Sequence, residues 1–493
     1  MSSHSTLYRQ VASDVAKDIE QGVYLADQKI PSVRKLSKQL QVSISTVNQA
    51  YALLEDQGLI RAKPQAGYFV RQGANDEPVP PPLSQGAEPK AVTKIDLINH
   101  ILAYANERSS ENLGSVNLGC AIPDYSFLPY RSLQTHMQKV TRFEMEEVFN
   151  YQFSPGLESL RSQIALRMRD VGLRCHADDI VITQGCSEAL HLCLSSATQR
   201  GDIIAVESPC YYGFLQMAKL RGLKVIEIPT DPAHGISIEA LKLALEQWSI
   251  SAIILTSRYS NPTGGSINSE KQKRLVELAR QFDCQIIEDD IYGEMPIDSS
   301  VLSKGGESGE KQAINTVIKT HDTDDRVMYC SSYSKTIGAG LRIGWCIPGK
   351  NKKAVIQAQR FSTMAASSLP QLTMASYLQN GHYDKHLRSL RLMISENIKS
   401  FSQTVQYCFP KGTRLSVPSG GFILWICLPD NVSSIDLLHL AQAESICIIP
   451  GDIFSNSDQF RNYIRLNCAV PWNDHVRAAL IRLGEMTEQL MLS

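Results

Sequence analysis

One lysine of this chain stands in a setting that suits covalent chemistry with a carbonyl compound. Lys335 lies in Ser332-Tyr-Ser334-Lys335-Thr, and Arg342 follows seven positions later. A lysine amine forms a Schiff base with a carbonyl group when its neighbours keep it reactive. Hydroxyl groups and an arginine beside it suit a phosphate. So short a motif also occurs by chance, and the motifs that accompany it decide its meaning.

Four further motifs precede this lysine, and each follows an apolar run. They are the Gly185 turn with Cys186 and Ser187, Tyr211 in Pro-Cys-Tyr, Asn261 in Asn-Pro-Thr-Gly, and Glu288-Asp289-Asp290 with Tyr292. A glycine turn that opens a helix offers free N–H groups to a phosphate, and an aromatic side chain after a strand can stack on a planar ring. Each motif also has a plain structural interpretation, as an ordinary turn or a packed tyrosine. Three carboxylates at a strand end are costly to bury, so a metal site and a solvated strand end are the alternatives there.

The apolar runs ahead of these motifs alternate with longer helical patterns. Such alternation is typical of an α/β domain with a mostly parallel sheet, in which sites form at the carboxyl ends of the strands. The motifs are therefore predicted to meet at one edge of this sheet. The strand-like runs are 180–183, 203–206, 252–256, 284–288 and 327–330.

In this order the motifs supply each group that pyridoxal 5'-phosphate needs. The cofactor needs a lysine for the Schiff base and a carboxylate that keeps the pyridine nitrogen protonated. It also needs donors at its 3'-oxygen, and hydroxyls with an arginine at its phosphate. The sequence therefore predicts a pyridoxal phosphate site.

On these motifs, residues 115–490 resemble the fold-type I, class I aminotransferases, which add a smaller C-terminal α+β subdomain. The resemblance implies that Lys335 forms the Schiff base and that Asp289 pairs with the pyridinium, as the catalytic residues. It implies that Arg465, in Tyr-Ile-Arg-Leu-Asn, binds a substrate α-carboxylate. It implies that Tyr151, in Tyr-x4-Gly-x3-Leu-Arg, reaches the phosphate of a neighbouring subunit. The other cofactor contacts it implies are Asn261 and Tyr292 at the 3'-oxygen, Tyr211 on the ring, and Cys186, Ser187, Ser332, Ser334 and Arg342 around the phosphate.

The first 73 residues differ in composition from the rest of the chain. They hold nine Lys or Arg against six Asp or Glu, and none of the 12 cysteines or four tryptophans. Apolar spacing predicts helices over 7–21 and from Ser32, then a turn and a third helix. A hairpin is predicted over 59–70. This order is typical of a winged helix–turn–helix that reads DNA, although small three-helix bundles in general share it. The third helix is predicted to bury Val47, Ala50, Tyr51 and Leu54.

Residues 7–70 resemble the GntR family of winged-helix regulators, on Pro31-Ser-Val-Arg34-x-Leu-Ser, Thr46-Val and Ala50-Tyr-x2-Leu54. Many members carry an arginine where this chain has Ile44, so the operator sequence does not follow from the resemblance. The resemblance implies DNA contacts by Arg34, by the start of the third helix, and by a glycine at the wing tip. Polar groups on that helix suit base edges, and cations beside it suit phosphates. The predicted DNA contacts are Arg34, Lys35, Ser43, Ser45, Thr46, Asn48, Lys63 and Gly67.

The stretch between the two parts contains five prolines among polar residues over 73–90, which favours an extended spacer. We therefore predict a DNA-binding domain over 5–73, a linker over 74–94, and a pyridoxal phosphate-binding domain over 95–493. A second polar stretch, 299–325, is predicted to be a surface insertion.

The two parts together resemble the MocR subfamily of GntR regulators over almost the whole chain. The resemblance implies a domain-swapped homodimer, in which each DNA-reading head lies against the large domain of the partner. It also implies that the cofactor, or an amino compound bound to it, shifts the heads on DNA. A ligand moves such an equilibrium only if it binds one arrangement better. The leading hypothesis is a pyridoxal phosphate-dependent, DNA-binding transcriptional regulator. The alternatives are a working aminotransferase with an appended DNA-binding module, and a cofactor-holding protein without signalling.

Composition excludes several other classes of protein. The chain has 493 residues, 43% of them apolar, and a net charge of −1, which excludes wholesale disorder. No apolar run reaches the roughly 18–20 residues of a membrane-spanning helix. The cysteines stand singly with no C-x-x-C pair, which argues against a zinc site and a disulfide framework. A cytoplasmic protein with no metal and no membrane partner is expected.

Overall fold

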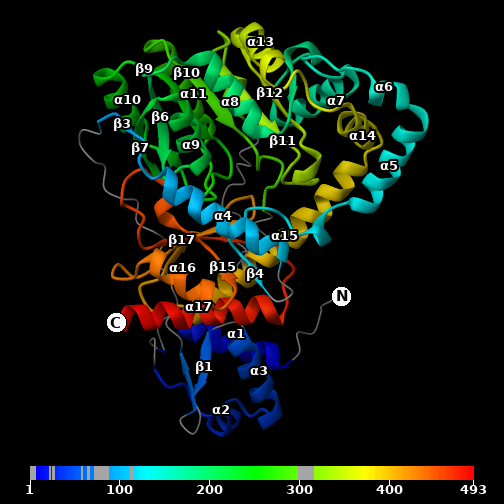
Figure 1. Cartoon of the computed structure of the whole chain (residues 1–493). Helices are drawn as coiled ribbons and strands as arrows, with labels where there is room; N and C mark the ends of the chain where they lie inside the picture. Colours follow the sequence, from blue (N-terminus) through cyan, green and yellow to red (C-terminus); the bar gives the residue numbers. More distant parts are fainter. Residues whose placement is uncertain are drawn as a thin grey trace.

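The structure is a computed structural model, and it describes residues 7–20, 24, 28–56, 59–63, 67–70, 88–111, 115–297, 316–416 and 418–492. Two regions follow from the arrangement in Figure 1, and we name them the head (residues 7–70) and the body (residues 88–492). Most of the predicted linker (74–87) and of the predicted insertion (299–315) lies outside the described residues.

The head is a three-helix unit with a two-stranded wing. Its helices are α1 (Leu7–Glu20), α2 (Val33–Leu40) and α3 (Ile44–Asp56), and its antiparallel strands are β1 (Ile60–Lys63) and β2 (Gly67–Val70). The Ser32 side chain caps α2 by accepting the Lys35 N–H, as serine commonly does at a helix start. The predicted apolar stripe of α3 is buried and forms the core of the head with side chains of α1 and β1. The predicted helices, turn and hairpin are confirmed.

The body contains a central sheet with the strand order β3-β7-β6-β9-β10-β11-β12-β5 and a short β8 beside β7. Strands β7, β6, β9, β10 and β11 run parallel, whereas β12 runs antiparallel to both of its neighbours. The predicted mostly parallel sheet is therefore confirmed. The bounds are β3 (Lys90–Ala91), β5 (Val181–Thr183), β6 (Ile203–Ser208), β7 (Lys224–Asp231), β8 (Gly235–Ile236), β9 (Ile250–Thr256), β10 (Gln285–Asp289), β11 (Val327–Ser332) and β12 (Gly344–Ile347).

Helices cover both faces of this sheet, because its strands are apolar on both sides. One face packs against α8 (Cys186–Ala197), α9 (Tyr212–Arg221) and α13 (Lys352–Ser362). The other packs against α10 (Ile238–Gln247) and α11 (Ser269–Gln281). A further group of helices lies beyond β5 and β12, at the right of Figure 1. It comprises α5 (Tyr130–Phe143), α6 (Met145–Phe149), α7 (Glu158–Met168) and α14 (Ser368–Gln379).

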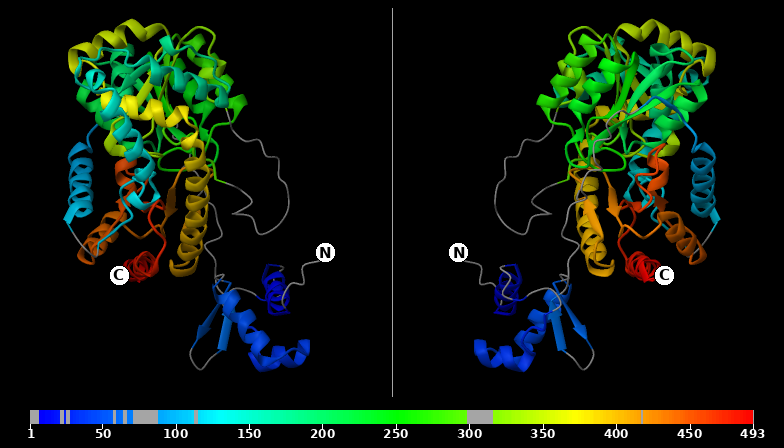
Figure 2. Two further views of the ribbon diagram at one scale, coloured as in Figure 1. Left: turned by 90° about the vertical axis from the view of Figure 1, so that its right-hand side faces the viewer. Right: turned by 90° about the vertical axis from the view of Figure 1, so that its left-hand side faces the viewer.

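A smaller α+β lobe completes the body on the side that faces the head. Its sheet has the order β13-β14-β17-β16, and β4 pairs with β15 beside it. The long helix α15 (His382–Cys408) runs from the helices around α14 down into this lobe, as Figure 2 shows. The other elements are α4 (Ile95–Glu111), β4 (Val116–Asn117), β13 (Arg414–Ser416), β14 (Ile423–Cys427), α16 (Ser434–Ala443), β15 (Ile446–Cys447), β16 (Ile449–Pro450), β17 (Tyr463–Asn467) and α17 (Asp474–Leu492).

The predicted C-terminal boundary of the linker, residue 94, was wrong, because residues 88–94 contain structure that belongs to the body. Lys90 and Ala91 form β3, the edge strand next to β7. The Thr93 N–H donates to Asn456 Oδ1 at 2.9 Å, and Lys94 Nζ lies 3.0 Å from a carboxylate oxygen of Asp458. Backbone pairing and these contacts fix a stretch whose composition alone resembles a spacer.

The predicted C-terminal boundary of the insertion, residue 325, was also wrong, because residues 316–325 pack as part of the body. Val317 and Ile318 are fully buried. The Glu288 carboxylate accepts the N–H of Ile318 at 2.7 Å and the N–H of Lys319 at 3.0 Å. On the other side of the gap, the Ile297 N–H donates to the carbonyl of Ser419 at 3.1 Å. Both described ends of this gap are therefore held by the body.

None of the helices in the described part of the chain combines the length and the apolar character that crossing a membrane requires.

Candidate functional site

A cavity of about 320 Å³ lies between the central sheet and the smaller lobe. Its volume is in the range of small-molecule sites. Asp289 ends β10, and Lys335 follows β11, so the predicted convergence at the strand ends places both in its wall. Arg465 enters the same wall from β17 of the smaller lobe. The other predicted site residues in the wall are Cys186, Ser187, Tyr211, Asn261 and Tyr292.

The Lys335 amine is held in a setting that favours its neutral form. Its Nζ donates to the carbonyl of Ala121 at 2.6 Å and lies 5.9 Å from the centre of the Tyr292 ring. Burial, with the positive charge of Arg465 as a further cause, lowers the pKa of Lys335 to about 8. An amine with such a pKa is partly unprotonated near neutral pH, which is the nucleophilic form.

The three carboxylates after β10 have three different surroundings. Glu288 accepts the two backbone N–H groups described above, and Asp290 pairs with the buried guanidinium of Arg258. Asp289 is 3% exposed. Among the described residues its carboxylate accepts a hydrogen bond from the Cys186 thiol at 3.4 Å and one from the backbone N–H of Ile291. Burial, aided by the charge of Asp290, raises the pKa of Asp289 to about 7. A solvated strand end is therefore wrong, and within the described residues these carboxylates form no cluster suited to a metal ion.

Two tyrosines line the cavity near this carboxylate. The Tyr292 hydroxyl is buried and finds no hydrogen-bond partner among the residues that the structure describes. Tyr211 precedes α9, and its ring packs edge-on against Phe214, with the ring centres 5.6 Å apart. Burial raises the pKa of both hydroxyls, so both stay protonated and can donate.

Arg465 is a buried cation whose donors point at neutral oxygens. It is 1% exposed, and one Nη donates to Asn261 Oδ1 at 3.1 Å while the other donates to the carbonyl of Gly119. Its Nε has no partner among the described residues. Because a buried guanidinium is most stable beside an anion, this position suits a carboxylate ligand.

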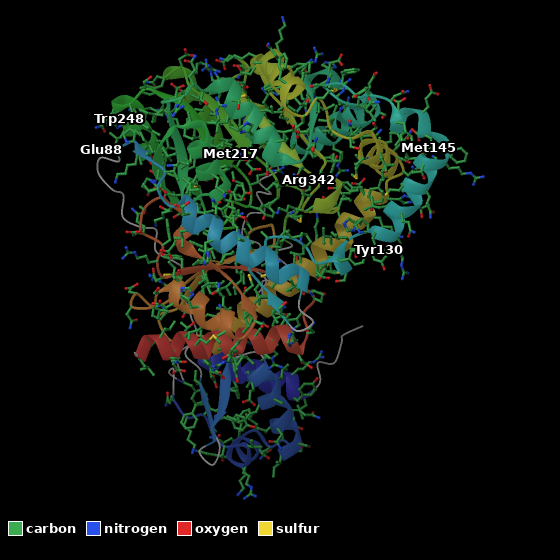
Figure 3. All side chains as sticks on the ribbon, in the orientation of Figure 1. Glu88, Tyr130, Met145, Met217, Trp248 and Arg342 are labelled. Carbon is green, nitrogen blue, oxygen red and sulfur yellow. The ribbon has the colours of Figure 1, made fainter. Side chains whose placement is uncertain are left out.

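The predicted phosphate-binding residues are only partly brought together. Gly185 has a φ of +87° where α8 begins, and Cys186 and Ser187 there line the cavity. Arg342, labelled in Figure 3, donates from one Nη to the Gln184 carbonyl at 2.7 Å, directly beside this turn. Ser332 ends β11 and Ser334 follows it; both are buried, and the Ser334 N–H donates to the Ser332 hydroxyl. Arg342 and these two serines do not line the cavity itself.

Tyr151 lies away from the cavity of its own chain. It is 79% exposed and lies in a shallow hollow with Phe149 and Met364. The nearby side chains of α5 and α6 point outward at the right-hand rim of Figure 3, where Met145 is labelled. Large apolar side chains in this region are widely exposed, namely Phe143, Phe149, Phe153 and Phe361.

Several wall residues were missed by the sequence analysis. They are Leu102 of α4, the segment 119–122, Leu190 of α8, Tyr212 and Gln216 of α9, Thr256 of β9, Ile291, and Ile449 of β16. The segment 119–122 takes part through backbone carbonyls, which no residue type reveals. Tyr212 and Gln216 are four residues apart on one helix, so they share a face that the Tyr211 motif could have indicated.

The predicted DNA contacts lie on the outer side of the head. Ser43 Oγ lies 2.8 Å from Ser45 Oγ and 2.7 Å from Thr46 Oγ1 at the start of α3. Asn48 is exposed one turn further along α3, and Arg34 and Lys35 are exposed on α2. Lys63 pairs with Gly67 across the hairpin, and Gly67 has a φ of +103°, which favours glycine. The side chain of Lys63 lies outside the described part of the chain.

Comparisons with known families match two separate parts of the chain. Residues 7–70 match the bacterial regulatory proteins of the gntR family. Residues 116–483 match the class I and II aminotransferases.

Two relatives from Escherichia coli (strain K12) match the chain from end to end. The HTH-type transcriptional regulator YjiR is 37% identical over 99% of this chain and 100% of its own length. The HTH-type transcriptional regulator YdcR is 31% identical over 98% of this chain and 99% of its own length.

Solved structures match the body. The multiple substrate aminotransferase of Thermococcus profundus has a TM-score of 0.72 at 23% identity, over 81% of this chain and 96% of that one. An archaeal alanine:glyoxylate aminotransferase has a TM-score of 0.73 at 23% identity, over 83% and 96% respectively. At this identity the likeness establishes the fold of the body.

Proposed function

This chain belongs to the HTH-type transcriptional regulators that join a gntR-family domain to a class I and II aminotransferase domain, and we propose that pyridoxal phosphate in the body controls its binding to DNA. One observation carries the proposal. The Lys335 amine, the Asp289 carboxylate and the Arg465 guanidinium line one cavity, in a chain whose first 70 residues fold as a helix–turn–helix head.

The residues of the cavity fit this cofactor. Asp289 is buried, and among the described residues its side-chain donor is a thiol, so a protonated ring nitrogen would give it a charged hydrogen-bond partner. The unpartnered hydroxyl of Tyr292 and the amide of Asn261 suit the 3'-oxygen. Lys335 would form the covalent link through its neutral amine.

The remaining predicted contacts would hold the ring and the phosphate. The Tyr211 ring would lie against the cofactor ring, and the N–H groups at the start of α8, from Cys186 and Ser187, would face the phosphate. Arg342 lies beside that turn, and together with Ser332 and Ser334 it would complete the phosphate site. The bound cofactor supplies a ring that accepts electrons from an attached amino compound.

We also infer a ligand of the bound state, namely an amino compound with a carboxylate. Arg465 would bind this carboxylate through its Nε and Nη groups, and the carbonyl of Gly119 and the Asn261 oxygen would then lose a donor. Occupancy would therefore change the contacts of the 119–122 segment. A change of this kind affects DNA binding only if it favours one arrangement of the heads.

A homodimer completes this proposal, with each head placed against the body of the other subunit. The widely exposed aromatic side chains around α6 support it, because an apolar patch of this kind usually marks an interface. Tyr151 in the same patch would then reach the phosphate in the partner's cavity. The exposed polar face of α3 and the cations of α2 would bind double-stranded DNA.

A gel-shift experiment with the full chain tests the proposal. The protein, with and without pyridoxal phosphate, is titrated against its own upstream DNA and against random duplex at several salt concentrations. We expect the cofactor to change the affinity for the upstream DNA by roughly fivefold or more, in the range of typical allosteric coupling. Lys335→Ala should abolish this response, whereas Lys353→Ala, an exposed lysine of α13, should keep it.

Two results would contradict the proposal: no salt-sensitive preference for the upstream DNA, or an equal response of the Lys335→Ala variant.

A second candidate function is amino-group transfer between amino acids and keto acids. It is favoured by the presence of Lys335 and Arg465 in one cavity, since these are the groups that a first half-reaction requires. Multiple-turnover formation of a new amino acid from a keto acid would establish it. A change in DNA affinity without such turnover would favour the regulator.

A further inference from the structure

The part of the cavity next to Arg465 has an apolar wall. Ile449 of β16 pairs with Arg465 of β17, so the two side chains project from the same face of the smaller sheet. Leu102 of α4 and Ile122 also line the cavity, and so do Tyr212 and Gln216 of α9. A ligand whose carboxylate binds Arg465 therefore directs its side chain toward mainly apolar groups.

The charged groups of the cavity are already assigned. Among the described residues of the wall, the cations are Lys335 and Arg465, and the carboxylate is Asp289. The proposed function uses Lys335 and Asp289 for the cofactor and Arg465 for one carboxylate. A second carboxylate or an amine on the ligand side chain would lack a partner, and an unpaired charge is costly to bury.

We infer that the cavity selects an amino compound with one carboxylate and an uncharged, mainly apolar side chain, which contacts Leu102. The inference rests on the proposed function, because it needs the cofactor on Lys335 and the carboxylate on Arg465. It adds a class of ligand and a residue that selects it.

The contact with Leu102 also connects this ligand with the start of the body. Leu102 lies on α4, and Gln216 Nε2 of α9 donates to Asn99 Oδ1 of the same helix at 3.1 Å. The chain reaches α4 directly from β3 and from the linker to the head. A side chain that pushes on Leu102 thus acts on the first helix after the linker.

The test uses the full chain loaded with pyridoxal phosphate and five probes: L-leucine, L-phenylalanine, L-aspartate, L-glutamate and L-lysine. The change in the visible absorbance of the bound cofactor and the shift in melting temperature report binding of each probe. We expect half-saturation with leucine or phenylalanine at a concentration at least tenfold lower than with the three charged probes. Equal or tighter binding of a charged probe would overturn the inference.

Variants locate the selecting residue. Leu102→Arg should weaken the binding of leucine at least tenfold and strengthen the binding of aspartate. His100→Arg, a change at an exposed position of the same helix, should leave the order of affinities for the probes unchanged. Leu102→Ala, a smaller change, should weaken the binding of leucine and leave the binding of aspartate unchanged. Unchanged preferences in both Leu102 variants would overturn its role. Failure of the cofactor to bind at all would instead contradict the proposed function.

An independent observation concerns the first residue of α3. Ile44 is 51% exposed, whereas Val47, Tyr51 and Leu54 of the same helix are buried. It stands between Ser43 and Ser45, whose hydroxyls lie 2.8 Å apart. The head therefore presents an apolar side chain at the N-terminal end of α3, the helix that corresponds to the one that enters the major groove in helix–turn–helix proteins.

The apolar group that the major groove offers is the C5-methyl group of thymine. We infer that Ile44 contacts a thymine methyl group and so selects an A·T pair at one position of each half-site. This inference also rests on the proposed function, through DNA binding by the head. It assigns a base preference to the residue in which this chain departs from many GntR members.

Deletion of single methyl groups from DNA tests this contact. Each thymine of the upstream site is replaced in turn by deoxyuridine, and the affinity of the full chain is measured by gel shift. At one position per half-site we expect a loss of about fourfold, the equivalent of roughly 0.8 kcal/mol for one methyl group. Ile44→Ala should lose this sensitivity, whereas Leu40→Ala, an exposed position at the end of α2, should retain it.

Binding of the upstream site that is insensitive to every replacement would overturn the role of Ile44. Absence of any preference for that site would contradict the proposed function itself.

Discussion

The head and the cavity of the body present their polar groups in opposite ways. In the head, Ser45 and Asn48 are exposed on the surface of one helix, within a few residues of each other. In the body, Asp289 and Arg465 are almost fully buried and lie 176 positions apart in the sequence. The polar groups of the head are therefore in contact with water until a partner binds, whereas the charges of the cavity are already shielded from water in the free protein. Charges held in this way gain most from a ligand that supplies the missing partner.

The largest expected effect tests whether the head and the body unfold independently. Leu54→Ala removes a fully buried side chain from the core of the head, so we expect the free energy of unfolding of the head to fall by about 2–5 kcal/mol. DNA binding should decline while cofactor binding by the body stays unchanged. Thermal unfolding followed by circular dichroism, with Leu40→Ala as the exposed control, measures the difference. A parallel loss of cofactor binding would mean that the two regions unfold as one.

The next effect concerns the buried carboxylate. Asp289→Asn keeps the shape of the side chain but removes the charge that would hold a protonated ring nitrogen. We expect the affinity for pyridoxal phosphate to fall by about 1.5–3 kcal/mol, the typical value of a charge-assisted hydrogen bond. Equilibrium titration measures it, and Asp178→Asn, at an exposed carboxylate, is the control. An unchanged affinity would remove Asp289 from the cofactor site.

The pH dependence of cofactor coupling tests the amine. The pKa of Lys335 is lowered to about 8, and only the neutral amine attacks a carbonyl group. The rate of coupling should therefore rise about tenfold between pH values of about 7 and 9 and level off above them, as the amine becomes fully neutral. Stopped-flow absorbance measures the rate. With the ordinary lysine pKa, the rate would instead rise about a hundredfold over the same interval and continue to rise above it.

A smaller effect is expected on the surface of the head. Arg34→Ala should weaken binding to all DNA sequences by about 1 kcal/mol and reduce the slope of log affinity against log salt concentration by about 1. Lys17→Ala, at an exposed position of α1, is the control and should change neither quantity. Fluorescence anisotropy at several salt concentrations measures both. A loss limited to the upstream site would indicate base recognition by Arg34 instead.

The smallest effect tests the contribution of the second subunit. Tyr151→Phe removes one hydroxyl that would reach the partner's phosphate, so cofactor affinity should fall by about 0.5–1.5 kcal/mol. The loss should appear only at protein concentrations at which the chain is dimeric. Titration across a dilution series, with Tyr125→Phe as the exposed control, separates the two conditions. An equal loss in the monomer would place the effect within one chain.

Local patterns were sufficient for the head and for five strands of the central sheet. The apolar stripe from Val47 to Leu54 repeats with the period of a helix, and the five predicted strands all lie in the central sheet. In the cavity, residues were predicted where a chemical group defines a role, such as the amine of Lys335. These predictions were possible because the residue type alone indicates the chemical role of the side chain.

The other features depend on position. Ala121 contacts Lys335 through a backbone carbonyl, and Leu102 reaches the cavity only because α4 packs there. The strand β3 forms because β7 offers an open edge, which the polar sequence around Lys90 does not reveal. Val317 and Ile318 are two apolar residues at the end of a polar stretch, too few to show a pattern.

The hydrogen bonds that Glu288 accepts from the backbone of Ile318 and Lys319 have a practical consequence. The N–H of Ile297 is held on one side of the gap, and the N–H groups of Ile318 and Lys319 are held on the other. The length of chain between these anchors is therefore independent of the geometry around Asp289. An epitope or a fluorescent reporter introduced between the two anchors should therefore leave the cavity intact.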